Sequence, residues 1–231
     1  LKGRNVEVTA SATTAKTTTE EDAPFTENLV DAGLLNFAEF MGWSVAKATA
    51  EVSVGSGTIL QADSDAILSA DADAESVITT GGGGVAFTYA ESEGTSKAAI
   101  ERGAQVSAGG NLTVKAVTNN TDKATSTAVK GMIQFALTEA TSKADAYIAD
   151  GALIHANNVD VIADINNEME TEAKPFEFGD GESAGVSVAI SQLTSTANAY
   201  VNADLAIPGD LNIKATTTTE NKTSAAAEPK S

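Results

Sequence analysis

The chain has 231 residues, of which 42% are hydrophobic but only 5% aromatic, so any core must be built mainly from small side chains. A net charge of −18 disfavours nucleic acid and anionic membranes as partners. The absence of cysteine excludes disulfides, thiolate zinc sites and cysteine nucleophiles, and no apolar run approaches the roughly 20 residues of a membrane span. Because the sequence opens at Leu1 without a signal peptide, we expect a segment of a longer protein.

A short motif of alternating apolar residues that ends in alanine recurs five times along the chain. Its central residues are Val8, Leu68, Val114, Val161 and Ile213, which lie 60, 46, 47 and 52 residues apart. The similarity extends beyond the motif, because "TSKADAYIADGALIHANNVDVIA" (141–163) is echoed by "TSTANAYVNADLAIPGDLNIKA" (194–215). Phased copies at this spacing predict a repeat architecture.

Within each repeat the hydrophobic period is two, which indicates β-strands. In "SKADAYI" one face carries Ser142, Ala144, Ala146 and Ile148, and turn residues such as "GG" (109–110), "NN" (157–158) and "PGD" (208–210) separate such stretches. Helical spacing is scarce. The best candidate is "NLVDAGLLNFAEFM" (28–41), in which Val30, Leu34, Phe37 and Met41 would share one helical face.

A repeat that cannot bury its own apolar face must stack on its copies. We therefore predict an all-β fold, a parallel β-solenoid of flattened, alanine-lined rungs of about 46–52 residues, forming one segment over residues 1–231. A sandwich of antiparallel sheets is the main structural alternative. Stacking predicts these matches between rungs: Ala144 with Ala197, Ile148 with Val201, Tyr147 with Tyr200, and Lys47, Lys97 and Lys143 in one outer row.

Two acidic insertions interrupt the repeats, near residues 18–43 and 173–184, and both contain a Pro-Phe pair. They enter at the same phase of the rung, so we expect loops or a short helix at one edge of the solenoid. The candidate partner-binding residues are aromatic and lie in or beside the first insertion: Phe25, Phe37, Phe40 and Trp43. The alternative is that they pack over the solenoid edge.

The segments "AYIADGALIHANNVDVIA", "AAIERGAQVSAGGNLTVKA" and "AYVNADLAIPGDLNIKA" resemble the repeats of giant exported bacterial surface proteins, the filamentous-haemagglutinin-like adhesins. The resemblance runs from Val6 to Ala215 and is specific for architecture rather than activity. It implies a β-solenoid and a location outside the cell or on its surface. Such repeats act mostly as stalks, scaffolds or adhesive rods, and the two insertions depart from the pattern.

Calcium-binding candidates form the densest acidic cluster of the chain: Asp63, Asp65, Asp71, Asp73 and Glu75. Carboxylates are suitable calcium ligands, but strict alternation with alanine also fits a solvated outer face. No EF-hand loop is present, and we expect no other cofactor.

Two further motifs have simpler interpretations. "GGGG" (81–84) lacks the Lys-Ser/Thr of a phosphate loop and fits a turn. His155, the only histidine, alternates outward between Ile154 and Ala156, and its counterparts in other rungs are Gln61, Ser107 and Pro208. Paired asparagines at 119–120, 157–158 and 166–167, with Asn111, predict hydrogen-bonded stacks at rung corners.

These observations favour a non-catalytic structural or adhesive rod segment of an extracellular bacterial protein. Its expected partners are neighbouring repeats of the same or an identical chain through the open strand edges, and surface glycans or proteins. Two alternatives remain at this point: a carbohydrate-binding or polysaccharide-degrading β-helix protein, and a calcium-stabilised rod. The degrading enzyme is disfavoured because only Arg4 and Arg102 are arginines, too few for a groove that holds an acidic polysaccharide.

Overall fold

The computed structural model describes residues 1–20, 41–176 and 186–226, and all the regular secondary structure assigned to these residues is β-strand. The strands are β1 (Lys2–Gly3), β2 (Val6–Glu20), β3 (Met41–Val54), β4 (Ile59–Ala62), β5 (Ala66–Ile100), β6 (Gln105–Ala108), β7 (Asn111–Ile148), β8 (Leu153–His155), β9 (Asn158–Phe176), β10 (Val186–Val201), β11 (Asp204–Ala206) and β12 (Leu211–Ala225). The described residues contain no helix long and apolar enough to cross a membrane.

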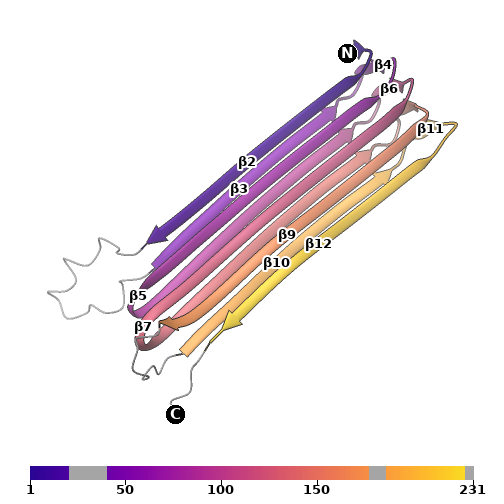
Figure 1. Cartoon of the computed structure of the whole chain (residues 1–231). Helices are drawn as coiled ribbons and strands as arrows, with labels where there is room; N and C mark the ends of the chain where they lie inside the picture. The colour runs from indigo at the N-terminus through magenta and orange to yellow at the C-terminus, as the bar shows by residue number, and fades with distance from the viewer. Residues whose placement is uncertain (21–40, 177–185, 227–231) are drawn as a thin grey trace.

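The strands form three stacks of parallel strands. Figure 1 shows the long strands of successive rungs running side by side, with the short strands at one end. The short sheet has the order β1-β4-β6-β8-β11. β5 and β7 each run out and back, since residues 66–80 pair with β2 whereas residues 87–100 pair with β3. We call the two long sheets the outgoing wall and the return wall. The outgoing wall contains β2, the first half of β5, the first half of β7, β9 and β12. The return wall contains β3, the second half of β5, the second half of β7, and β10. All these pairings are parallel, which confirms the β-solenoid and excludes the antiparallel sandwich.

The short sheet and the adjoining ends of the two walls enclose the aliphatic part of the core. Fully buried side chains from all three stacks meet here: Leu60, Leu68, Ile100, Leu112, Ile148 and Ile154. The turns before the short strands place Gly57, Gly103 and Gly151 at φ values of 74°, 74° and 73°, a conformation that suits glycine. These turns also stack, because the amides of Gly57 and Gly103 donate to the carbonyls of Gly103 and Gly151 at 3.2 and 3.1 Å.

Away from the short sheet the two walls pack directly on each other through small polar residues, which we call the polar seam. Hydroxyl pairs bridge the walls, such as Ser96 with Thr118, whose oxygens are 2.7 Å apart, and Thr138 with Thr171 at 2.6 Å. Buried polar groups are tolerated when they are hydrogen-bonded, and hydroxyls satisfy each other here. The buried residues of the seam are Ser44, Ser76, Thr80, Thr88, Ser92, Ser96, Thr118, Asn120, Asp122, Ser126, Gln134, Thr138, Ser142, Asn167 and Thr171.

The register between rungs confirms some of the residue matches predicted from the sequence and contradicts one of them. Ala144 pairs with Ala197, Ile148 with Val201, and the rings of Tyr147 and Tyr200 stack with centroids 5.0 Å apart. The predicted row of lysines is wrong. Lys47 instead pairs with Glu93, and Lys97 pairs with Glu51 and Asp145. A shift by two or four residues leaves the alternation intact, so opposite charges, not periodicity, favour the observed register.

The insertions are shorter than the sequence suggests. β2 extends to Glu20 and β3 begins at Met41, so Met41 belongs to a strand, and β9 extends to Phe176. Val30, Leu34 and Phe37 of the predicted helix lie outside the described residues.

The prediction that asparagines form hydrogen-bonded stacks at rung corners is confirmed in part. The side-chain amides of Asn158 and Asn166 donate to those of Asn111 and Asn119 at 2.8 and 2.9 Å, but the second pair lies in mid-wall rather than at a corner.

The first testable consequence concerns the spacing of the walls. A Cβ added to Gly94 would lie 2.3 Å from Asn120 Oδ1 and 2.5 Å from Thr118 Cγ2, both buried on the facing wall. We expect Gly94→Ala to destabilise the fold by about 1–3 kcal/mol in urea unfolding. Gly55→Ala is the control, because its nearest neighbour would be Thr58 Oγ1 at 3.9 Å. Equal stability of the two variants would contradict the close packing.

The second consequence concerns Asp122, whose Oδ2 accepts a 2.5 Å hydrogen bond from Ser92 Oγ while its Oδ1 has no partner. Burial raises the pKa of this carboxyl to about 8; the bond from Ser92 opposes the rise, and Glu91 and Glu139 add to it. The folded chain therefore holds this proton up to about pH 8, whereas the unfolded chain releases it near pH 4. The resulting stabilisation is complete below about pH 4 and is lost as the pH rises towards 8.

We expect Asp122→Asn to flatten this decline and to be more stable than the natural chain at pH 8 by a few kcal/mol, roughly. The measurement is urea unfolding at intervals between pH 4 and 9. The exposed Asp210→Asn should retain the slope of the natural chain. An unchanged slope in Asp122→Asn would mean that Asp122 is not the group responsible.

Candidate functional site

The outer face of the return wall carries a grid of apolar side chains, which we call the aromatic patch. Alternation turns these residues outward, since Ala86, Thr88 and Ala90 between them are fully buried. Register then aligns them across rungs: Trp43 with Tyr89, Leu137 and Ile190, and Phe87 with Phe135 and Val188. Ile133 and Val186 extend the patch at its far edge. The patch therefore consists of Trp43, Phe87, Tyr89, Ile133, Phe135, Leu137, Val186, Val188 and Ile190.

The patch is open to solvent along its length. Trp43 is 58% exposed, Ile190 52% and Phe135 37%, and the centroid of the Trp43 ring lies 4.7 Å from that of Tyr89, which is only 9% exposed. Single exposed apolar residues are ordinary, but a contiguous apolar surface that spans several strands usually marks a contact with another molecule.

Acidic side chains border the patch on the side nearer the short sheet. The Tyr89 hydroxyl lies 3.0 Å from Glu91 Oε2 and 2.9 Å from Glu139 Oε2, and it can donate to either. Lys47 Nζ is 3.7 Å from Glu91 and 2.5 Å from Glu93. Burial raises the pKa of Tyr89 above its ordinary value, and its bonds to Glu139 and Glu91 raise it further. The phenol therefore stays protonated as a donor that orders the carboxylates at this border.

Of the predicted partner-binding aromatics, the structure places only Trp43, at one end of this patch. Phe25, Phe37 and Phe40 lie outside the described residues. Sequence reasoning missed the rest of the patch, although one signal was present. "VAFTYAE" (85–91) and "IQFALTE" (133–139) repeat an outward aromatic with a 48-residue spacing, and the structure pairs Phe87 with Phe135.

The calcium candidates do not converge. Asp63 and Asp65 lie in a corner turn, where Asp65 Oδ1 accepts a hydrogen bond from the backbone N–H of Asn111 at 2.7 Å. Asp71 and Asp73 face outward, and the Asn119 amide donates to Asp73 at 2.6 Å. Burial, and then Asp73, raise the pKa of Asp71. Within residues 1–20, 41–176 and 186–226, no three acidic or histidine side chains are grouped closely enough to hold a metal ion.

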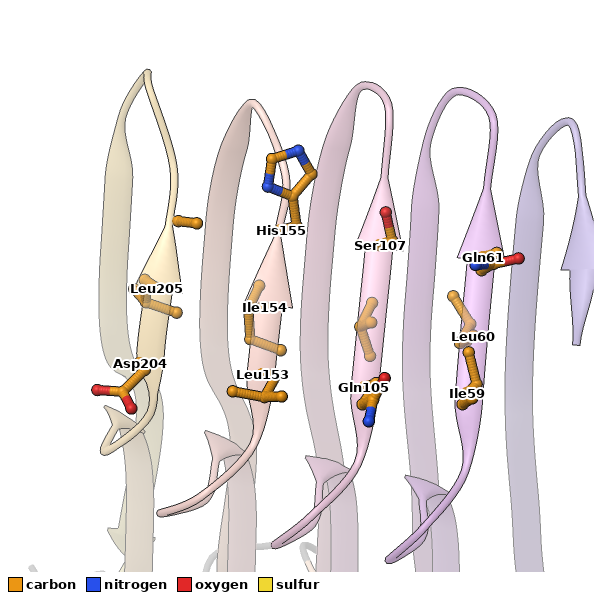
Figure 2. Close-up of a pocket in the computed structure, with 12 residues that line it drawn as sticks. Ile59, Leu60, Gln61, Gln105, Ser107, Leu153, Ile154, His155, Asp204 and Leu205 are labelled. Atoms are coloured by element: carbon orange, nitrogen blue, oxygen red, sulfur yellow. The ribbon is translucent and has the colours of Figure 1, made fainter.

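A second surface lies along the outer face of the short sheet, where a groove of about 380 Å³ runs across β4, β6, β8 and β11. Figure 2 shows its outward side chains in two rows, with Ile59, Gln105, Leu153 and Asp204 in one and Gln61, Ser107 and His155 in the other. His155 is exposed, as its alternation predicted. Its counterpart in the last rung is Ala206, not Pro208, because the turn between β10 and β11 is two residues shorter than the turn between β7 and β8.

The chemistry of the groove is that of hydrogen bonding beside apolar contacts. Gln61, Gln105, Ser107 and His155 offer donors and acceptors, while Ile59 and Leu153, 52% and 53% exposed, offer apolar area. Asp204 is the only carboxylate among the described residues that line it. Glycoside hydrolysis ordinarily needs two carboxyl groups, so this lining suits binding better than hydrolysis.

Comparison with protein-family models, with curated proteins and with solved structures gives no match for this chain. The two surfaces must therefore be interpreted from their own chemistry.

A prediction follows for the contact between Trp43 and Tyr89. Because burial is the main cause of the raised pKa of Tyr89, Trp43→Ala should lower that pKa towards the ordinary value near 10. In a spectrophotometric titration, the variant should release a tyrosine proton at lower pH than the natural chain. In a Tyr89→Phe background, removal of Trp43 should leave the titration unchanged. Identical titrations of the natural chain and Trp43→Ala would show that Trp43 does not cover Tyr89 in solution.

Proposed function

We propose that the chain is a non-catalytic rod segment of an extracellular bacterial surface or filament protein, with the aromatic patch as its adhesive surface. The observation that carries the proposal is the combination of a parallel ladder with an exposed apolar surface built across four rungs of it. The patch lies on the outer side of a wall whose inner side already supplies the packing.

The rod role rests on the ladder. Each rung hydrogen-bonds to the rung before and after it, and the rise is about 4.8 Å per rung. Stacked side chains reinforce the ladder, as the parallel rings of Tyr147 and Tyr200 and the turn amides of Gly57, Gly103 and Gly151 illustrate. Such a structure resists bending, and its outward side chains repeat from rung to rung along the axis. These are the properties required of a stalk or scaffold.

The adhesive role rests on the chemistry of the patch. The faces of Trp43 and Phe135 can stack on sugar rings or on apolar side chains of a cell-surface protein, and Glu91 and Glu139 at the border favour partners without strong negative charge. The extracellular location follows from the resemblance of the repeats to those of exported surface proteins. Glycans and surface proteins are therefore the proposed partners.

The groove on the short sheet supports a second candidate, a carbohydrate-binding solenoid. Gln61, Ser107 and His155 occupy equivalent positions on three successive rungs along the groove, which suits an extended chain of repeating units such as a linear glycan. This candidate places the ligand on a different face from the patch, so the two can be separated by mutation.

The test is retention of labelled bacterial and host polysaccharides and of whole cells by the immobilised chain, with new reducing ends measured in parallel. We expect retention without cleavage, reduced at least about tenfold in a Trp43→Ala, Phe135→Ala double variant, which loses the aromatic contacts. An Ile59→Ala, Leu153→Ala variant is the matched control, because it removes exposed apolar area from the groove instead. Trp43 is the only tryptophan, so its fluorescence reports directly on occupancy of the patch.

Each other outcome has a distinct meaning. Loss of retention only in the groove variant would favour the carbohydrate-binding candidate. New reducing ends would contradict the non-catalytic assignment. Absence of retention by any form would remove the adhesive role and leave a rod without a partner on this face.

A further inference from the structure

Two carboxylates at the border of the aromatic patch lie opposite each other on neighbouring strands. Glu91 of β5 pairs in register with Glu139 of β7. Both face outward, because Ser92 and Ala140, the residues that follow them, are buried between the walls. Like charges directly opposite each other are destabilising in a sheet. The return wall therefore carries two adjacent negative charges at the edge of an apolar surface.

The chain itself neutralises these two charges only in part. The Tyr89 hydroxyl lies 3.0 Å from Glu91 and 2.9 Å from Glu139, but its one proton can be donated to only one of them at a time. Lys47 Nζ lies 2.5 Å from Glu93 and farther, 3.7 Å, from Glu91. In the part of the chain that the structure describes, no lysine or arginine forms an ion pair with Glu139. A positive charge brought by a partner would therefore meet carboxylates that lack a full counter-charge.

The carboxylates have a fixed position relative to the apolar part of the patch. On β7 the outward residues Phe135, Leu137 and Glu139 follow one another at every second position, and β5 repeats this arrangement in the neighbouring rung. Residues two apart on a strand are separated by about 6.6 Å. An extended segment lying along these strands would place apolar side chains over Phe135 and Leu137, and its next side chain on the same face at Glu139. The complementary pattern is thus alternate apolar residues followed by a basic one.

The composition of the patch favours a polypeptide over a glycan as the partner. Aliphatic side chains of β7 and β10 form more than half of it: Ile133, Leu137, Val186, Val188 and Ile190. These side chains offer no hydrogen-bonding group. Sugar hydroxyls placed over them would lose their bonds to water without gaining new ones, which costs free energy. The apolar side chains of a polypeptide are stabilised by the same contact.

The charge of the whole chain acts in the same direction. A net charge of −18 repels acidic segments and attracts basic ones over a distance, which raises the rate at which a basic partner reaches the surface. This attraction alone has no preferred site. The carboxylate pair beside the patch supplies a fixed position for the basic group.

We propose that the aromatic patch binds a basic amphipathic segment of another protein, with apolar side chains over the patch and a lysine or arginine at Glu91 and Glu139. The inference rests on the proposed adhesive function, and it selects proteins rather than glycans as the partners of the patch. A guanidinium group suits the carboxylate pair especially well, because its planar fork of five N–H donors can bond to both carboxylates at once. The apolar contacts supply affinity, and the charges supply specificity.

The experiment measures the binding of three labelled peptides to the 231-residue chain by fluorescence anisotropy and by the fluorescence of Trp43. The basic peptide carries valine at three alternate positions and arginine at the next two alternate positions, with threonine between them. In the acidic peptide glutamate replaces each arginine, and in the third peptide the arginines exchange places with threonines of the other face. We expect the basic peptide to bind saturably, with one site per chain, at least about tenfold more tightly than the other two.

Two double variants locate the charged part of the site. Glu91→Gln with Glu139→Gln removes both charges but keeps side-chain oxygens that accept a hydrogen bond from Tyr89, so the fold is retained, which a melting curve verifies. It should weaken binding of the basic peptide at least about tenfold and remove most of its salt dependence. The matched control is Glu7→Gln with Glu75→Gln, which changes the net charge equally on the exposed face of the outgoing wall and should leave binding nearly unchanged.

Equal effects of the two double variants would overturn the proposal, because the peptide would then respond to net charge alone. Undiminished binding of the basic peptide to the Trp43→Ala, Phe135→Ala variant would also overturn it, since the peptide would lie elsewhere. Retention of polysaccharides through the patch, without preference for the basic peptide, would reject this partner and leave the adhesive function intact. Binding of the basic peptide at the patch by a chain that retains no cells would instead reject the adhesive function and support the assigned partner chemistry.

Discussion

The close approach of the two long walls is the constraint on which the rest of the structure depends. Parallel stacking repeats each position at every rung, so the space between the walls must be compatible with the same kind of side chain several times in succession. Next to the short sheet a third face holds the walls apart, and Leu68, Ile100 and Leu112 fit between them. Beyond it the walls are in direct contact, and most buried side chains there are those of alanine, serine and threonine, with a few amides, Asp122 and three larger apolar residues, Ile78, Ile165 and Met169. The low aromatic content of the chain follows directly, because large rings have no place inside such a rung.

That constraint also explains why the polar groups are where they are. A seam of alanine alone would bury little apolar area per residue, and hydroxyls add hydrogen bonds between walls that are near enough to form them. Hydrogen bonding in the polar seam is incomplete at Asp122, because its Oδ1 has no partner and its carboxyl stays protonated at neutral pH. Aromatic residues excluded from the interior appear on the outer face instead. Trp43, Phe87 and Phe135 therefore lie where they are available to a partner, as a consequence of a core that cannot accept them.

The sequence predicts the architecture well because periodicity and repetition are local properties. Alternation shows which face of a strand is buried, and the similarity of residues 141–163 to residues 194–215 correctly matches Tyr147 with Tyr200 and Ile148 with Val201. The register of the less similar rungs is not predictable in this way, because a shift by two residues preserves every inward position. The lysine row failed for this reason. The aromatic patch escaped notice for the same reason, since Trp43, Tyr89, Leu137 and Ile190 become neighbours only when four rungs are in their observed register.

The outer rows of this acidic solenoid are mixed in charge, because lysines lie opposite carboxylates at several places, although Glu91 lies opposite Glu139 and Glu168 opposite Glu220. Strict repetition would stack carboxylate on carboxylate along each outer row, and like charges directly opposite each other are destabilising in a sheet. The observed register instead sets Lys97 Nζ 2.8 Å from Glu51, and Lys123 Nζ 3.3 Å from Glu168 and 3.5 Å from Glu170. Each exposed pair is weak by itself. Their common effect is on register, because a shift by two residues would preserve the buried face while it separated these charges, so the alternating core defines the faces and the outer charges select among the registers that the core allows.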